Sequence, residues 1–305
     1  MAWRGKHALP PADSLKRLGL IEGAPGGWYH RADMIRVPTV AGQFYPSRPE
    51  ALREIVLECL GGKPGEKTTG KQEAVAVLAP HAGYIFSGPC AGRVYASVRV
   101  PERVVVLCPN HTGIGEPVAV MGAGEWETPL GSVPVDESLA RELMAEDPDV
   151  SDDESAHRRE HSLEVQLPFL QVLSPHMRLV PLCVGTQRHD VLINLGDALA
   201  RVIHKAGEKV LIVISSDMSH YISAERAKAL DAKAISAMEA LDPVRLHEVV
   251  RRDRISMCGV APAVAGLQAA RALGARKGTL VSYTNSGDRT GDHREVVAYA
   301  GLIFN

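Results

Sequence analysis

The sequence predicts an α/β fold in which a central, mostly parallel or mixed sheet is flanked by helices. From residue 74 onward, short apolar runs alternate with helical patterns, an order typical of strand–helix–strand units. Several apolar runs are continuous and β-branched, as strands covered on both faces should be. No repeat, low-complexity tract or long linker interrupts this pattern. We therefore expect a single domain over residues 34–305.

Residues 1–33 differ in composition from the rest of the chain. They supply Gly, Pro and charged residues around one short amphipathic piece, LKRLGLI. The periodic pattern begins at MIRVPTVAGQFYP, so that Met34 is an alternative translation start. We interpret residues 1–33 as an N-terminal extension that carries no part of the function.

The strand candidates share short length and apolar, often β-branched content. In chain order they are AVAVLAP (74–80), RVVVLCP (103–109), PVAVM (117–121), MRLVPLCVG (177–185), KVLIVIS (209–215), TLVSYTN (279–285) and VVAYAGLIF (296–304). The helix candidates have apolar residues at helical spacing. They are PEALREIVLECL (49–60), SGPCAGRVYASV (87–98), DESLARELMAE (136–146), HSLEVQLPFLQVL (161–173), DVLINLGDALARVIHKA (190–206), SAERAKALDAKAISAMEAL (223–241) and VAPAVAGLQAARALG (260–274). We expect Asp136 to cap its helix and Pro168 to kink or interrupt the helix at 161–173.

Composition excludes several classes of partner. The chain has 305 residues and a formal net charge of −2, so there is no electrostatic reason to expect nucleic acid or an anionic membrane. No apolar stretch approaches the roughly 20 residues that span a bilayer. The five cysteines are scattered and lack a CxxC spacing, which favours a reducing cytoplasm. A small molecule or a peptide is the expected ligand.

A histidine follows three of the predicted strands, in LAPHAGY, LCPNHTG and SSDMSHY. In open α/β sheets, ligands bind beyond the carboxyl ends of the strands. A single histidine is more often a capping or half-buried residue, but His81, His111 and His220 would all arrive at this one edge. Asp217, three residues before His220, could orient it or act as an acid or base. The pattern predicts a metal site.

Cys258, in SMCGVAP, comes just before a predicted helix. A helix N-terminus lowers the pKa of a thiol and favours the thiolate that binds metals. The alternative is a small buried hydrophobe, the commonest state of a free cysteine. The residues alone leave both interpretations open.

The segment DESAHRREHSLEVQLPF places Glu160 and His161 at the start of an amphipathic helix, where they could contact a substrate or support the metal ligands. We interpret Glu164 as an acidic residue that favours the helix N-terminus. The remaining histidines of the periodic chain have charged or polar neighbours and are expected at the surface. They are His157, His176, His189, His204, His247 and His293.

Common cofactor motifs are absent from the sequence. There is no GxGxxG after a strand and no GxxxxGK[ST], so dinucleotide and P-loop sites have no support. Ser215 and Ser216 lie close to His220, but no GxSxG elbow accompanies them, so a serine nucleophile has little support.

The chain resembles the Memo family, named after a mediator of cell motility in animals. The matching stretches are VAGQFYP, LAPHAGYIFSGPCA, LCPNHTG, ETPLGSVPVD, EHSLEVQLPF, SSDMSHY, MCGVAP and VVAYAGL, in this order from about residue 36 onward. The family is similar in fold to the class III, non-haem iron extradiol dioxygenases. In many genomes its members lie beside a radical SAM protein and a small companion of the AMMECR type, which implies a shared pathway.

The resemblance implies roles for particular residues. His81, His111 and Cys258 would be the three metal-facing residues, with Asp217 and His220 beside them as catalytic partners. Phe44 matches an aromatic position that lines the pocket in relatives. From the residues themselves we expect Tyr84, just after His81, to begin the wall of the same pocket, to which Glu160 and His161 could also contribute. The dioxygenases hold iron with two histidines and a carboxylate, whereas a cysteine replaces the carboxylate here. A thiolate would favour copper(I) or zinc while still permitting iron(II), so ring cleavage does not follow from the fold.

Two hypotheses follow. In the first, the protein is a redox enzyme with one iron or copper ion, an open position for O₂ or substrate, and a proton shuttle formed by His220 and Asp217. In the second, the same pocket binds a peptide or another anionic ligand without catalysis, as the resemblance to animal relatives that bind phosphotyrosine peptides implies.

Overall fold

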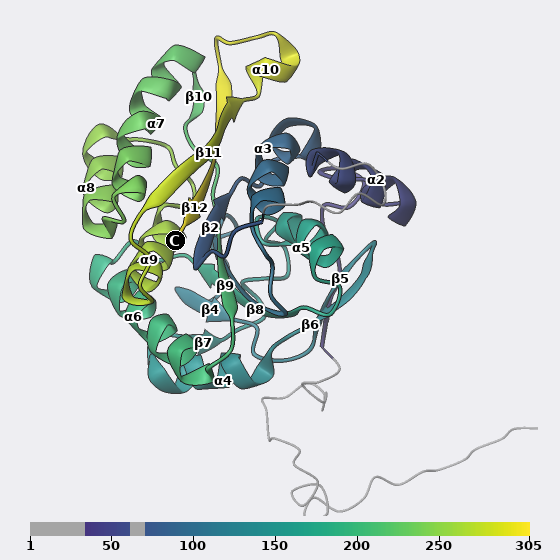
Figure 1. Ribbon diagram of the computed structural model, residues 1–305, viewed down its shortest axis with the longest axis vertical. Coiled ribbons are helices and arrows are strands. Elements are labelled where there is room, and N and C mark those ends of the chain that lie inside the picture. Colours follow the sequence, from purple (N-terminus) through teal and green to yellow (C-terminus); the bar gives the residue numbers. More distant parts are fainter. Residues whose placement is uncertain (1–33, 62–70) are drawn as a thin grey trace, which may run out of the picture.

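The computed structural model describes residues 34–61 and 71–305 (Figure 1). The predicted N-terminal extension lies outside the described residues. The strands are β1 (Ile35–Arg36), β2 (Ala76–Ala79), β3 (Arg103–Pro109), β4 (Val118–Val120), β5 (Glu125–Thr128), β6 (Gly131–Pro134), β7 (Ser151–Asp152), β8 (Arg178–Val184), β9 (Val210–Ser215), β10 (His220–Ile222), β11 (Gly278–Asn285) and β12 (Val296–Phe304). The α-helices are α2 (Pro49–Cys59), α3 (Tyr84–Ser97), α4 (Glu137–Glu146), α5 (Leu167–Leu173), α6 (His189–Ala206), α7 (Ala224–Glu239), α8 (Pro243–Asp253), α9 (Val260–Ala272) and α10 (Gly287–Thr290).

A nine-stranded sheet forms the centre of the domain. Eight of its strands lie in the order β10-β12-β2-β9-β3-β8-β4-β7. The ninth strand, β11, lies off this path and pairs with β12. The four central strands β2, β9, β3 and β8 are parallel to one another. Antiparallel partners flank them, with β12 against β2 and β4 against β8. The predicted single α/β domain with a mostly parallel or mixed sheet is therefore confirmed.

Helices cover both faces of this sheet (Figure 1). Along β2, Leu78 belongs to the core on the face covered by α4, α6, α7, α8 and α9, whereas Val77 belongs to the core on the face covered by α2, α3 and α5. The same alternation holds along β9 for Ile212 and Val213. Because successive residues of a strand point to opposite faces, a strand covered on both sides must be apolar throughout. This explains the continuous apolar runs of the sequence.

The predicted helix ends agree with the structure where a capping residue marks them. The Asp136 side chain accepts a hydrogen bond from the Leu139 backbone N–H at the start of α4, as predicted. The segment 161–173 is interrupted as expected, because α5 begins only at Leu167, with Pro168 in its first turn. A 3₁₀ helix (Glu164–Gln166) precedes it.

Helix α8 and several short strands did not figure among the predicted elements. Helix α8 buries Pro243, Leu246, His247 and Val250, which have helical spacing. That spacing is the signal by which the helix could have been found. The strands β1, β5, β6 and β7 have two to four residues each, which is too short for a periodic pattern.

Two of the histidines expected at the surface are buried, so that prediction was wrong for them. His157 is fully buried, and its ring lies edge-on to Trp126. His247 is also buried, on the inner face of α8, and its ring lies edge-on to His189. Charged neighbours in sequence predict an exposed segment, but they do not decide which side of that segment a residue faces.

Glu164 does more than favour a helix N-terminus. Its carboxylate is fully buried and pairs with the guanidinium of Arg36. It also accepts hydrogen bonds from the Thr39 and Val40 backbone N–H groups, over 2.9 and 3.1 Å, and from the Tyr45 hydroxyl. The carboxylate thus holds the segment from Arg36 to Tyr45 against the 3₁₀ helix that contains Glu164.

Removing the charge of Glu164 should destabilise the protein strongly. We expect Glu164→Gln to lower the free energy of unfolding by about 3–5 kcal/mol, because a buried guanidinium loses its counterion. Glu154→Gln, which removes the exposed partner of Arg158, should cost about 1 kcal/mol or less. Urea unfolding followed by circular dichroism measures both.

The Glu164 ion pair also predicts a pH dependence. Burial opposes its charge, but Arg36 and the hydrogen bond from Tyr45 lower the pKa of Glu164 below its ordinary value. The stabilisation by the ionised carboxylate should be complete above the ordinary carboxyl pKa and should be lost as the pH falls through the lowered pKa. In Glu164→Gln, the free energy of unfolding should lack this part of its dependence on pH. If the free energy of unfolding of the variant fell with decreasing pH as that of the wild type does, the assignment would be contradicted.

Helices α2 and α3 approach closely at a glycine. A Cβ atom at Gly92 would lie 2.1 Å from the backbone oxygen of Cys59, whereas one at Gly88, one turn earlier, would lie 2.8 Å from the Cys59 sulfur. A sulfur at the end of a side chain can rotate away, but a backbone oxygen cannot without moving the helix. Gly92 therefore sets the distance between the two helices.

Alanine substitutions at these two glycines should differ in effect. Gly92→Ala should lower the free energy of unfolding by about 1–3 kcal/mol, the usual cost of overpacking. Gly88→Ala is the matched control in the same helix and should leave the free energy of unfolding nearly unchanged. Alanine stabilises a helix by about 0.5–1 kcal/mol relative to glycine, which offsets the cost of rotating the Cys59 side chain away. Chemical denaturation of both variants tests this, and equal destabilisation by the two would argue against the close approach.

Within the described ranges, no helix combines the length and the apolar character needed to cross a membrane.

Candidate metal centre

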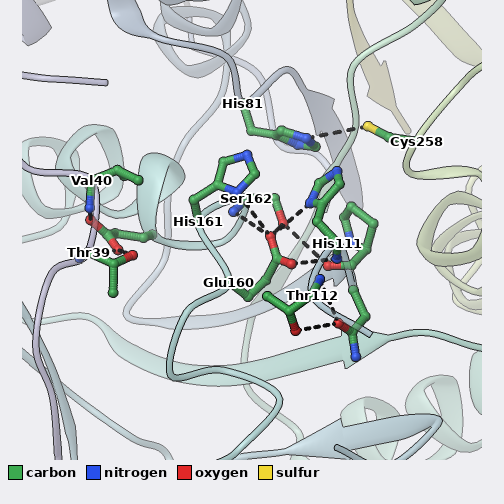
Figure 2. A network of polar contacts seen from close by, with 12 residues as sticks. Thr39, Val40, His81, His111, Thr112, Glu160, His161, Ser162 and Cys258 are labelled. Atoms are coloured by element: carbon green, nitrogen blue, oxygen red, sulfur yellow. Dashed lines mark hydrogen bonds and ion pairs between the residues drawn. The ribbon is translucent and has the colours of Figure 1, made fainter. Parts of the chain in front are cut away.

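The candidate site lies at the carboxyl edge of the parallel strands. Strand β9 lies between β2 and β3, and all three run in the same direction. His81 comes two residues after β2, and His111 comes two residues after β3. A third histidine, His161, reaches the same place from the segment that precedes the 3₁₀ helix (Figure 2).

The three imidazoles form one compact group. One ring nitrogen each from His81, His111 and His161 lies within 4.8 Å of the others, which makes the group a candidate for holding one metal ion. The ring centroids are 5.3 Å apart for His81 and His111, 5.6 Å for His81 and His161, and 4.8 Å for His111 and His161. The sequence placed His161 among the substrate contacts, whereas the structure groups it with the two histidines predicted to bind metal.

Hydrogen bonds determine which nitrogen of His81 is free. Its Nδ1 lies 2.9 Å from Ser215 Oγ. The Ser215 hydroxyl donates its single proton to the Ser162 carbonyl over 2.7 Å, so it accepts from the imidazole. His81 thus carries its proton on Nδ1 and presents the lone pair of Nε2. Burial, together with the neighbouring His161 and His111, holds the pKa of His81 well below its ordinary value, which keeps the ring neutral.

A buried carboxylate orients His111. Glu160 Oε1 accepts from His111 Nδ1 over 2.9 Å, and Oε2 accepts from the His111 backbone N–H over 2.6 Å. A histidine that binds metal commonly donates its other N–H to a carboxylate in this way. Burial opposes the charge of Glu160, but the hydrogen bond and charge of His111, with hydrogen bonds from Ser162, lower its pKa to about 2. The same carboxylate raises the pKa of His111 against the effect of burial.

His161 is held from two sides. Its Nδ1 lies 3.5 Å from Glu160 Oε1, and its ring packs edge-on against Phe44 at a centroid distance of 5.0 Å. Burial lowers the pKa of His161 despite the nearby charge of Glu160, so the neutral form that can bind a metal is favoured. Phe44 thus lies beside the histidine group.

Cys258 lies next to the histidine group, and its sulfur is 3.3 Å from His81 Nε2 (Figure 2). The thiol also accepts a hydrogen bond from the Asp217 backbone N–H over 3.2 Å. Of the two interpretations that the sequence left open for Cys258, the lowered thiol pKa is wrong, because burial and the charge of Asp217 raise the pKa of Cys258. A bound cation would reverse this, since metal coordination deprotonates a thiol.

Asp217 lies in the loop after β9, whereas His220 begins β10, and the two side chains take different positions. Asp217 Oδ1 accepts from the His81 backbone N–H over 2.8 Å, and burial raises the pKa of Asp217 to about 6. His220 is anchored away from the three-histidine group, because its Nδ1 lies 2.9 Å from the Ser256 carbonyl oxygen. The third histidine of the group is therefore His161 rather than His220.

Tyr84 lies in the aromatic core. Its hydroxyl donates to the Val165 carbonyl over 2.7 Å, and its ring packs against Tyr45 and Phe169. The side chain is 2% exposed. It therefore supports the site through packing, and its hydroxyl is already bound to the protein.

Sequence reasoning missed the polar residues that hold these groups. Gln166 Nε2 donates to Ser215 Oγ over 2.9 Å and to the Pro80 carbonyl over 3.1 Å, so it joins the ends of β9 and β2. Ser162 donates to Glu160 Oε1 over 2.6 Å from its hydroxyl. All three side chains are fully buried. Their signal in the sequence is a polar residue inside or directly after an apolar run.

Neutralising Glu160 should lower the pKa of His111. In Glu160→Gln, burial would no longer be opposed by a neighbouring negative charge, so the His111 ring should protonate at lower pH than in the wild type. NMR titration of the metal-free protein measures this, with the exposed His176 as an unaffected internal control. An unchanged His111 pKa would show that the carboxylate does not govern the ring.

Comparison with known proteins gives one consistent result. A family model described as Memo-like protein matches residues 36–303. A MEMO1 family protein of Aquifex aeolicus is 47% identical, over 88% of this chain and 99% of the relative. MEMO1 family proteins of Methanopyrus kandleri and Methanocaldococcus jannaschii are 42% and 40% identical, over 89% and 88% of this chain and over 99% and 98% of the relative. The chain therefore belongs to the Memo family.

Proposed function

We propose that the protein is a redox enzyme with one iron or copper ion, held by His81, His111 and His161. The observation that carries this proposal is the close grouping of three imidazole nitrogens within 4.8 Å of one another. The lone pairs of His81 and His111 are fixed on Nε2 by hydrogen bonds at Nδ1. Ligands oriented by a second layer of hydrogen bonds are typical of metal sites.

The donor set fits a transition metal. Neutral imidazole suits iron, copper and zinc, whereas magnesium and calcium prefer oxygen ligands. The Cys258 sulfur is close enough to His81 Nε2 to approach the same ion, and a thiolate ligand would favour copper(I) or zinc while permitting iron(II). We therefore propose Cys258 as a fourth ligand of the ion, in addition to the three histidines.

The chain's own residues would control binding and proton movement. When bound, the ion supplies electron transfer and Lewis-acid chemistry toward O₂ or a substrate. Asp217, with a pKa of about 6, can hold or release a proton beside the backbone of His81 near neutral pH. His220, three residues further along the chain at the start of β10, would pass that proton to solvent because it is partly exposed.

A pocket for a peptide or another anionic ligand is the second candidate function. Tyr221 is 75% exposed directly after His220, and Phe44 packs against His161. Aromatic side chains of this kind contact ligands at many interfaces. A measurement of metal binding distinguishes the two functions, because a pocket that binds a peptide or another anionic ligand needs no ion.

Loss of any histidine of the group should abolish tight metal binding. Each of His81→Ala, His111→Ala and His161→Ala should weaken binding of iron(II) or copper by more than the roughly 10–100-fold that loss of a supporting residue costs. His176→Ala removes an exposed histidine and is the matched control. Elemental analysis and competition with a chelator, on protein without a metal-binding tag and reconstituted anaerobically, measure these effects.

Cys258→Ser separates three-ligand from four-ligand binding. If sulfur coordinates the ion, the substitution should remove the thiolate-to-metal charge-transfer absorption of the copper(II) form and weaken binding. Unchanged affinity and spectrum would leave the three histidines as the ligands. A wild-type protein that retains no iron, copper or zinc after reconstitution would overturn the proposed enzyme and favour the binding module.

A further inference from the structure

Two cysteines lie side by side behind the candidate metal centre. Cys108 on β3 and Cys183 on β8 are direct partners in the parallel register, so their side chains project from the same face of the sheet. Both are fully buried and belong to the same apolar core. The other three cysteines of the chain, Cys59, Cys90 and Cys258, lie on other elements.

The strand geometry allows a bond between these thiols. Neighbouring strands lie about 4.7–4.9 Å apart, and disulfides form between Cα atoms about 4.4–6.8 Å apart. The Cβ atoms of a disulfide are usually about 3.5–4.5 Å apart, so the strands must shift slightly to close the bond. A bond formed with such a shift is easily reduced again, which suits a reversible redox pair better than a structural cross-link.

A chain of polar contacts connects the thiols to the histidines. Cys183 Sγ donates to the Pro109 carbonyl at 3.7 Å, and Ser162 Oγ lies 3.4 Å from the same oxygen. The Ser162 hydroxyl donates to Glu160 Oε1 over 2.6 Å. Glu160 in turn holds His111. Apolar packing alone requires none of these contacts.

We propose that Cys108 and Cys183 form a redox-active dithiol that supplies one electron to each of two ions bound in turn at the histidine group. The inference rests on the proposed function. Cys108 lies at the carboxyl end of β3, and His111 follows it by three residues, two residues beyond the strand. The dithiol would serve as an internal reductant that restores the reduced ion.

Oxidation of the dithiol changes three bonds. Two S–H bonds break and one S–S bond forms, so that the dithiol loses two electrons and two protons. Two equivalents of copper(II) or iron(III) are each reduced by one electron. The two protons are released to solvent.

Burial restricts which oxidants can reach Cys108 and Cys183. A bulky disulfide such as oxidised glutathione cannot reach thiols that are fully buried, so direct exchange from outside should be slow. An oxidant bound at the histidine group bypasses this barrier. Oxidation of the pair should therefore depend on the metal site.

The test uses the reduced full-length protein with two equivalents of copper(II), under anaerobic conditions. Bound copper is measured on the same samples, followed by denaturation, alkylation and mass spectrometry. We expect two copper(I) ions per protein, detected with a copper(I) chelator, and a cross-linked peptide pair containing Cys108 and Cys183. Oxidised glutathione without metal should give no cross-link in the same time.

Variants define the pathway. Cys108→Ala and Cys183→Ala should each abolish the cross-link, whereas Cys90→Ala, which removes another fully buried cysteine, should retain it. His111→Ala should slow formation of the cross-link at least tenfold. Circular dichroism confirms that each variant is folded.

The outcomes separate the two ideas. Bound copper with Cys108 and Cys183 still fully alkylated would overturn the dithiol and leave the metal site standing. A cross-link that forms in His111→Ala as fast as in the wild type would overturn electron transfer through the histidine group. Absence of bound copper in the wild type would instead overturn the proposed function.

Discussion

The Glu160 carboxylate is the interaction on which the candidate site depends. It is fully buried, and it accepts hydrogen bonds from the backbone and ring of His111 and from the backbone and hydroxyl of Ser162. These contacts join the loop after β3 to the segment that carries His161. A buried charge is tolerated only when its hydrogen-bonding capacity is used, so the two loops must meet in one arrangement. Two of the three imidazoles are placed by that requirement.

A second buried carboxylate extends the same principle to the rim of the site. Glu164 binds the first described segment through Arg36 and through backbone groups at Thr39 and Val40. That segment continues to Phe44, whose ring lies against His161. The two glutamates are four residues apart, so one short stretch of chain organises both the ligands and the aromatic residue beside them.

The sequence was sufficient for the fold and for part of the site. Continuous apolar strands alternating with amphipathic helices required a sheet covered on both faces, and residues directly after parallel strands had to meet at one edge. His81 and His111 followed from that rule. The place of His161 did not, because its position depends on the loop that Glu160 holds rather than on a strand end.

The same limit explains the other differences. His220 follows a strand as His81 does, yet a hydrogen bond to the Ser256 carbonyl directs its ring elsewhere. The pKa of the Cys258 thiol depends on burial and on Asp217, and neither can be read from the start of a helix. His157 and His247 have polar neighbours in sequence, yet both are buried, against Trp126 and His189 respectively. In each case a long-range contact outweighed the local signal.

The three grouped histidines come from segments that are far apart along the chain, and this couples the site to the whole fold. An unfolded chain does not hold His81, His111 and His161 together, so a metal ion would bind the native state almost exclusively. Mass action then adds stability, about 2.7 kcal/mol when free metal exceeds its dissociation constant a hundredfold. Metal supply would thereby control how long the protein survives in a cell, since the ion-free form unfolds, and is degraded, more readily.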